Sequence, residues 1–111
     1  MKYIAHKAHQ PDSEIGMHLK AGDGLTWERR STPYAGWIWC TAITGETGWV
    51  PESWLEFDGA TCLLLRDYDS TELTIKPGDV LQGKLIESGW LYASNQQNVT
   101  GWVPLECVDS P

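Results

Sequence analysis

An internal repeat constrains this chain more than any other feature of its sequence. The run GWIWC at residues 36–40 returns as GWLYA at residues 89–93, and GWVP at residues 48–51 returns unchanged at residues 101–104. In both halves the second block begins 12 residues after the first. Self-similarity in order and spacing is the signature of repeated structural units. The chain is therefore expected to contain two related units of roughly 50 residues each.

A third block fixes the limits of the repeats. LKAGD at residues 19–23 matches IKPGD at residues 75–79, in the same order relative to the other blocks. The boundary then falls near residues 56–60, which predicts two domains, residues 1–56 and residues 61–109. A boundary segment of this length spans at most ~18 Å and carries the apolar Phe57, so we expect the two units to pack together.

Each repeat is predicted to be all-β. Apolar residues alternate in short runs between turn-rich clusters, and no window keeps a helical period. Pro77-Gly78 suits a type II turn, and the corresponding Ala21-Gly22 would serve in the first repeat. Alternation on the strands predicts a set of core residues: Cys40, Val50, Ala93 and Val103.

Composition excludes several classes of partner. Hydrophobic residues make up 41% of the 111 residues, which is enough to form a core. A net charge of -7 disfavours nucleic acid and anionic lipid, because both are bound through clustered Lys and Arg. No run approaches the ~18 apolar residues of a membrane span, and residues 1–10 lack the apolar stretch of an export signal, so we expect a cytoplasmic protein.

Cysteine and histidine give no sign of a metal or cofactor site. The three cysteines form no C-x-x-C pair, so they are expected to be buried thiols. His6 and His9 are three apart, which would place them on opposite faces of a strand. Acid pairs such as Asp67 and Asp69 are expected to be solvated surface. We therefore expect no metal, no cofactor and no catalytic activity.

The second repeat resembles an SH3 domain. It carries LLRDY at residues 64–68, ELTIKPGD at 72–79, GWLYA at 89–93 and GWVPLECV at 101–108, the order of the family's four sequence blocks. The first repeat matches more loosely, with AHKAH at residues 5–9 as its first block.

The resemblance implies an all-β fold of two tandem SH3-like five-stranded barrels packed together. In this arrangement the chain is similar to small tandem SH3-like proteins of bacteria. The resemblance also makes the segments of Cys62 and Cys107 the first and last strands of one barrel, which would bring them close together.

The resemblance further implies one peptide groove in each repeat. In the first repeat the lining residues would be Lys7, His9, Trp37, Trp49, Pro51 and Trp54. In the second they would be Arg66, Tyr68, Trp90, Trp102, Pro104 and Cys107. The first groove has lost both tyrosines of the initial strand, and the second has lost the final aromatic. The first is expected to bind more strongly, because it keeps three tryptophans and has Asp12 and Glu14 in the neighbouring loop.

These residues predict a non-catalytic module that binds a protein or an extended, proline-rich peptide, in a chain expected to be monomeric. For Trp37 and Trp90, a ligand platform and packing between the repeats are equally good interpretations. Trp39 and Tyr92 either extend the aromatic stripe or meet each other between the repeats. The alternative functions are an accessory domain pair that docks on a larger protein and, less favoured without an export signal, binding to cell-wall peptide.

Overall fold

The structure is a computed structural model, and it describes residues 1–11 and 16–110. It is built of β-strands and two short 3-10 helices, with no α-helix among the described residues. The strands of the two larger sheets are β1 (Lys2–Ala5), β3 (Gly24–Glu28), β4 (Trp37–Ala42), β5 (Thr47–Pro51), β6 (Leu55–Asp58), β7 (Thr61–Leu64), β9 (Val80–Glu87), β10 (Trp90–Ser94), β11 (Thr100–Pro104) and β12 (Val108–Asp109). The described residues include no helix long and apolar enough to span a membrane.

The chain divides into two compact units, of which unit 2 is the continuous stretch Gly16–Ser70. Its five-stranded antiparallel sheet has the order β5-β4-β3-β7-β6. The 3-10 helix η1 (Glu52–Trp54) connects β5 to β6. A separate two-stranded sheet joins β2 (His18–Leu19) to β8 (Tyr68–Asp69), so both ends of the unit are held side by side.

Unit 1 is discontinuous, because it combines Met1–Ile15 with Thr71–Pro111. Its sheet has the order β11-β10-β9-β1-β12, and η2 (Leu105–Cys107) precedes β12. Leu81, Ala93 and Val103 are fully buried in its core. A five-stranded sheet in each compact unit agrees with the all-β fold predicted from the sequence.

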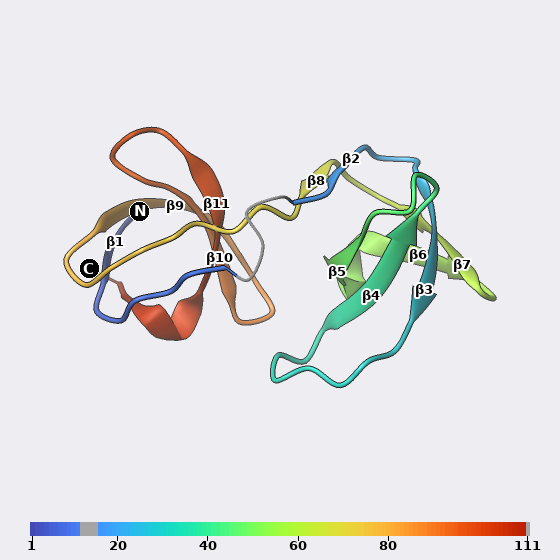
Figure 1. The fold of residues 1–111 in the computed structure, drawn as a ribbon, viewed down its shortest axis with the longest axis horizontal. Coiled ribbons are helices and arrows are strands. Elements are labelled where there is room, and N and C mark those ends of the chain that lie inside the picture. The colour runs from blue at the N-terminus through green and yellow to red at the C-terminus, as the bar shows by residue number, and fades with distance from the viewer. Residues whose placement is uncertain (12–15, 111) are drawn as a thin grey trace. The chain divides into compact units, whose positions relative to one another are not determined.

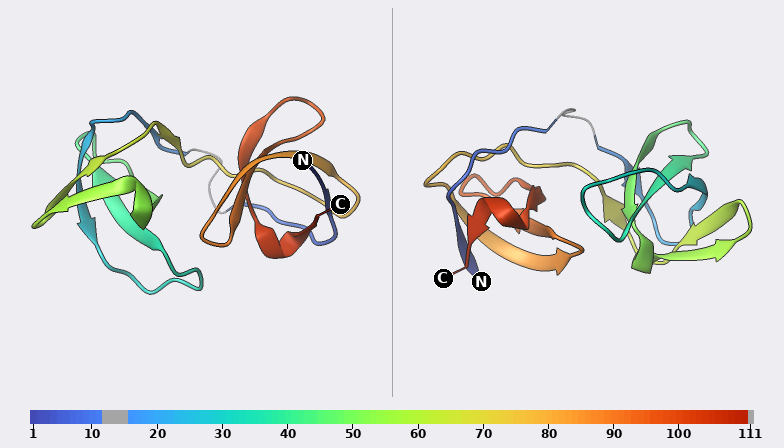
Figure 2. Two further views of the ribbon diagram at one scale, coloured as in Figure 1. Left: turned by 180° about the vertical axis from the view of Figure 1, so that it is seen from behind. Right: turned by 90° about the horizontal axis from the view of Figure 1, so that it is seen from below.

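The two repeats have exchanged their first strands. In Figure 1 the blue β1 of the first repeat lies in the sheet of β9, β10 and β11, and β7 of the second repeat lies with β3 and β6. Tyr3 pairs with Leu81 in unit 1, and Cys62 pairs with Leu25 at the corresponding place in unit 2. Figure 2 shows from two further sides that both chain termini belong to unit 1.

This exchange changes the organisation expected from the repeats. Residues 56–60 form no linker: β6 and β7 make a hairpin whose two-residue turn is Gly59-Ala60, with Asp58 paired to Thr61. Gly59 has a φ of 62°, and glycine with positive φ at the first turn position is typical of the tight turns that join antiparallel strands. The compact units consequently have different boundaries from residues 1–56 and 61–109. The turn reverses the chain at once, so the first strand of the second repeat must pair with the last strand of the first.

Side-chain volume also favours the exchanged pairing. A Cβ at Gly83 would overlap the ring of Tyr3, with Cδ2 only 2.9 Å away. The residue that corresponds to Gly83 in unit 2 is Trp27, and the residue that corresponds to Tyr3 is the smaller Cys62. Each unit therefore combines one large and one small side chain. Unexchanged repeats would combine Tyr3 with Trp27 and Cys62 with Gly83, and both pairings fill space badly.

Two sets of local predictions are confirmed. Cys40, Val50, Ala93 and Val103 each have 0% of their surface exposed. Gly22 and Gly78 have φ angles of 94° and 96°, as the predicted turns require, and in both turns the N–H of the following aspartate donates to the carbonyl three residues earlier.

The strand pairing expected to bring Cys62 and Cys107 together is wrong. Cys62 lies in unit 2, where its thiol hydrogen-bonds that of Cys40, whereas Cys107 lies in unit 1. The error follows from the exchange, because β12 takes β1 as its neighbour instead of β7. All three cysteines are buried free thiols.

Candidate functional site

One face of the β4–β5 hairpin carries the tryptophans of the first repeat. Trp37 pairs across the hairpin with Pro51, and Trp39 pairs with Trp49. Residues paired across strands point to the same face, so these four side chains form one surface. Ile38, between the two tryptophans of β4, points the other way into the core. The strand period thus separates core from site, as expected.

Four aromatic side chains form a row that begins with Trp39 and Trp49 of this face. The rings of Trp39 and Trp49 lie 5.2 Å apart in an edge-to-face arrangement. The Tyr68 hydroxyl donates to the Trp49 carbonyl at 2.7 Å, and the Tyr68 ring lies edge-to-face with Trp54 at 5.5 Å. We refer to Trp39, Trp49, Tyr68 and Trp54 as the aromatic row. Edge-to-face pairs add to the stability that burial alone provides, so the row has a defined geometry.

An arginine stacks at each end of the aromatic row. The Arg30 guanidinium lies 4.3 Å from the ring centre of Trp39, and that of Arg66 lies 4.1 Å from the ring centre of Trp54. Arg30 donates from both Nε and Nη2 to one carboxylate oxygen of Glu28, at 3.0 and 2.7 Å. Arg66 is exposed and forms no ion pair with any residue in the described part of the chain.

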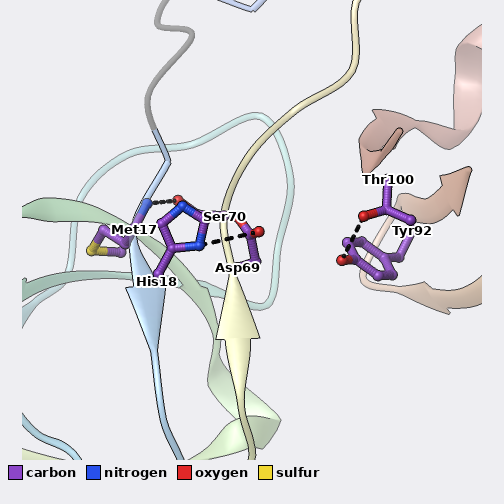
Figure 3. Close-up of polar contacts among 6 residues, drawn as sticks. All are labelled: Met17, His18, Asp69, Ser70, Tyr92 and Thr100. Carbon is purple, nitrogen blue, oxygen red and sulfur yellow. Dashed lines mark hydrogen bonds and ion pairs between the residues drawn. The ribbon is translucent and has the colours of Figure 1, made fainter. Parts of the chain in front are cut away.

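Tyr68 is held in place by the contacts of its neighbours. Figure 3 shows Ser70 accepting from the Met17 N–H at 2.6 Å, and Asp69 paired with His18 at 3.3 Å. Asp67 accepts from the Ala21 N–H at 2.9 Å. Together with the β2–β8 pairing, these contacts fix the second repeat's tyrosine beside the first repeat's tryptophans.

The two grooves expected from the resemblance are therefore assembled differently. Tyr68, expected with Trp90 and Trp102, lies in unit 2 with Trp49 and Trp54. His9, expected with Trp37, lies in unit 1. Tyr68 and His9 change units because each follows a first strand that has been exchanged. Its sequence signal is the Gly59-Ala60 turn, which the repeat pattern alone presents as a domain boundary.

Unit 1 has a histidine where unit 2 has Tyr68. The His9 ring lies edge-to-face on Trp90 at 5.6 Å, and its Nε2 lies 2.8 Å from a carboxylate oxygen of Glu72. Tyr92 packs on Trp102 with ring centres 5.0 Å apart, and its hydroxyl is within 3.4 Å of the Thr100 hydroxyl (Figure 3). Trp39 therefore packs on Trp49 within unit 2, and Tyr92 packs on Trp102 within unit 1.

Exposure varies along the predicted sites. Trp37, Trp54, Tyr68 and Trp102 have between 3% and 8% of their surface exposed, and Pro51 and Pro104 are also buried. Trp39, Trp49 and Trp90 are half-buried, as is His9. The aromatic surface of unit 2 that a ligand can reach is thus provided by Trp39 and Trp49. Arg30 stacks on Trp39 at this surface, and Arg66 stacks on Trp54 at the other end of the row.

One further tryptophan of unit 2 lies outside the aromatic row. Trp27 packs on Phe57 at 4.8 Å and donates its indole N–H to the Gly59 carbonyl, so it supports the β6–β7 turn. Asp12 and Glu14 fall outside the described residues.

Two observations describe the titratable and metal-binding groups of the described residues. Burial and the adjacent Cys62 thiol raise the pKa of Cys40 to about 12, which keeps its thiol protonated. The described residues contain no cluster of three or more His, Cys, Asp or Glu side chains that could hold a metal ion.

The sequence of the first repeat matches a family model. The model is that of the variant SH3 domain, and it covers residues 2–58, about half of the chain. The chain belongs to the variant SH3 domain family. SH3 domains are typically non-catalytic and generally act as binding modules. Comparison with curated proteins and with solved structures gives no match. The matched segment extends over both compact units, because residues 2–15 belong to unit 1 and residues 16–58 to unit 2.

Proposed function

We propose that this protein binds an extended peptide segment through the aromatic row of unit 2. The observation that carries the proposal is the row itself: two half-buried tryptophans, Trp39 and Trp49, continued by Tyr68 and Trp54. Flat aromatic surfaces suit proline-rich segments, whose left-handed helix is ordered before binding and loses little entropy on docking. Membership of the SH3 family supports a protein or peptide partner in general.

The second repeat is, in this proposal, a second SH3-like domain. Its four sequence blocks support that assignment, as does the five-stranded sheet of unit 1, to which it contributes β9 to β12. The pairing of Trp90 with Pro104 and of Tyr92 with Trp102 is equivalent to that in the first repeat. Unit 1 carries His9 in place of a tyrosine, and Trp102 is more deeply buried than its counterpart Trp49. We therefore propose that unit 2 provides the stronger site.

Burial of several predicted contact residues supports a second candidate, an accessory domain pair that docks on a larger protein without a peptide groove. Trp37, Trp54 and Tyr68 are at most 8% exposed and already fill space inside the structure. In this role the aromatic side chains would stabilise the units, and another surface would contact the partner. The two candidates differ in whether a short peptide perturbs Trp39 and Trp49.

A peptide titration tests the first candidate. Tryptophan indole N–H signals would be followed while a panel of proline-rich peptides is added to the full chain. The proposal predicts shifts of the Trp39 and Trp49 signals. A central aromatic contact typically contributes ~2 kcal/mol or more, so Trp49→Ala should weaken binding roughly thirtyfold. Trp102→Ala, at the equivalent position of unit 1, is the matched control and should change affinity little.

Unfolding by urea must be measured for both variants, because a tryptophan that supports the fold would reduce binding through unfolding alone. A folded Trp49→Ala protein with unchanged affinity would reject the row as the site. A panel without any effect would favour docking on a larger protein. We further propose a monomer located in the cytoplasm, a compartment that suits three free thiols.

A further inference from the structure

All three arginines of the chain stack on tryptophans of unit 2. Arg30 and Arg66 lie on Trp39 and Trp54 at the two ends of the aromatic row, and Arg29 lies 5.8 Å from the ring centre of Trp27, outside the row. One cation therefore lies at each end of the aromatic row on which we place a ligand. Stacking holds a guanidinium by its flat face and leaves its N–H edge available to an acceptor.

The two arginines of the row differ in how far they are neutralised. Arg30 already donates from Nε and Nη2 to the carboxylate of Glu28, which neutralises its charge locally. Arg66 is exposed and forms no ion pair with the described residues. A planar guanidinium with free N–H groups can bind a carboxylate through two parallel hydrogen bonds. The Arg66 end of the row is thus the better place for an anionic group.

Three acidic residues of unit 2 have partners other than Arg66. Asp67 accepts from the Ala21 backbone N–H, and Asp69 is paired with His18. Glu52, which follows β5, lies within 3.5 Å of Arg29. The net negative charge of the chain acts over longer distances, where salt screens it beyond about 8 Å. A direct contact with Arg66 would outweigh that distant repulsion.

From these contacts we infer that the aromatic row selects an acidic ligand: an extended apolar segment with a carboxylate that binds Arg66. The inference rests on the proposed peptide-binding function and specifies the charge of its ligand. The apolar part of the segment lies on Trp49 and Trp39, and a carboxylate at one end of it reaches the Arg66 guanidinium.

Three matched decapeptides test this inference. They share a proline-leucine core and carry glutamate, glutamine or lysine at both ends, and their affinities for the full chain are read from the Trp39 and Trp49 indole signals. The glutamate peptide should bind about tenfold more tightly than the glutamine peptide, and the lysine peptide more weakly than either. The advantage of glutamate should fall as salt increases.

The Arg66→Gln variant links the preference to one side chain. It should bind the glutamate peptide about as weakly as the glutamine peptide, with affinity for the glutamine peptide within about threefold of the unaltered chain. Arg29→Gln removes the same charge beside Trp27, outside the row, and should keep the preference for glutamate. Arg66→Lys, which keeps the charge but not the planar fork, should recover only part of it.

The outcomes separate this inference from the function on which it rests. Binding of the glutamine or lysine peptide as tight as that of the glutamate peptide would refute the acidic ligand and leave peptide binding intact. An unchanged glutamate preference in Arg66→Gln would refute the role of Arg66. The absence of any indole shift with all three peptides would overturn both proposals together.

Discussion

Substitution of Gly83 by alanine tests the exchanged packing of β1. The added methyl group would overlap the Tyr3 ring and would also lie 3.2 Å from Leu91 Cδ1. Gly83 lies in the interior of β9, and its φ is not in the left-handed region, so its backbone accepts alanine. The expected effect therefore comes from crowding between side chains.

The size of the effect can be estimated from packing. Overfilling a well-packed core typically costs ~1–3 kcal/mol. Replacing glycine by alanine at a compatible position stabilises a protein by about 0.4–1 kcal/mol, because the unfolded chain loses conformational freedom. The net destabilisation by Gly83→Ala should then be about 1–2 kcal/mol. Gly24→Ala is the control: Gly24 lies in β3 with no atom within 4 Å of its would-be Cβ, so no loss is expected there.

A double-mutant cycle makes the test specific to Tyr3. Tyr3→Leu removes the ring that meets residue 83 and should be destabilising alone, because Tyr3 is only 7% exposed. The double variant should be less destabilised than the sum of the single variants, by about 1 kcal/mol. Urea unfolding of the four proteins provides these free energies.

The result that would refute this reasoning is additivity. If β1 paired within its own repeat, Tyr3 would lie near Leu25 and Trp27, far from residue 83. The two substitutions would then add to within about 0.5 kcal/mol, as expected for independent sites. A destabilisation by Gly83→Ala that is independent of Tyr3 would assign the crowding to Leu91 instead.

Three further predictions follow from individual contacts. Gly101→Ala should destabilise more than Gly48→Ala in urea unfolding, because its Cβ would lie 3.0 Å from the Leu73 nitrogen and the Thr71 oxygen, whereas that of Gly48 meets the flexible end of Met17; the reverse order would contradict the packing. Tyr68→Phe should cost about 1 kcal/mol through loss of the hydrogen bond to Trp49, and an unchanged free energy of unfolding would mean that the hydroxyl makes no such bond. Burial raises the pKa of Cys40 from 9.0 to about 12, so between pH 9 and 12 the thiol ionises in the unfolded chain but stays protonated in the folded one. The contribution of the Cys40 thiol to the free energy of unfolding is therefore present below pH 9 and is lost between pH 9 and 12, at up to ~1.4 kcal/mol per pH unit. Cys40→Ala should therefore lose stability less steeply above pH 9, and parallel pH profiles would contradict the assignment.

The sequence predicts the strands well because their signals are local. Alternation identifies Cys40 and Val103 as core, and the Pro77-Gly78 dipeptide identifies its turn. Each of these features depends on a few neighbouring residues. The same is true of the face of β4 that carries Trp37 and Trp39, whose side chains oppose Pro51 and Trp49 as alternation requires.

The pairing of the first strands could not be obtained in the same way. β1 and β7 have the same alternating burial, so either strand satisfies the hydrophobic pattern of either unit. The two strands are distinguished by the size of the side chains that face β3 and β9. The two-residue Gly59-Ala60 turn also keeps β7 paired with β6. His9 comes shortly after β1 and Tyr68 shortly after β7. The pairing of these two strands therefore decides which of the two residues joins the tryptophans of each unit.

Nuclear Overhauser effects between side chains of this chain test the strand exchange most directly. We expect nuclear Overhauser effects between the Tyr3 ring and the α-protons of Gly83, and between the rings of Tyr68 and Trp54. Contacts of Tyr3 with Leu25 and of Tyr68 with Trp102, in place of these, would contradict the exchange and the aromatic row built on it.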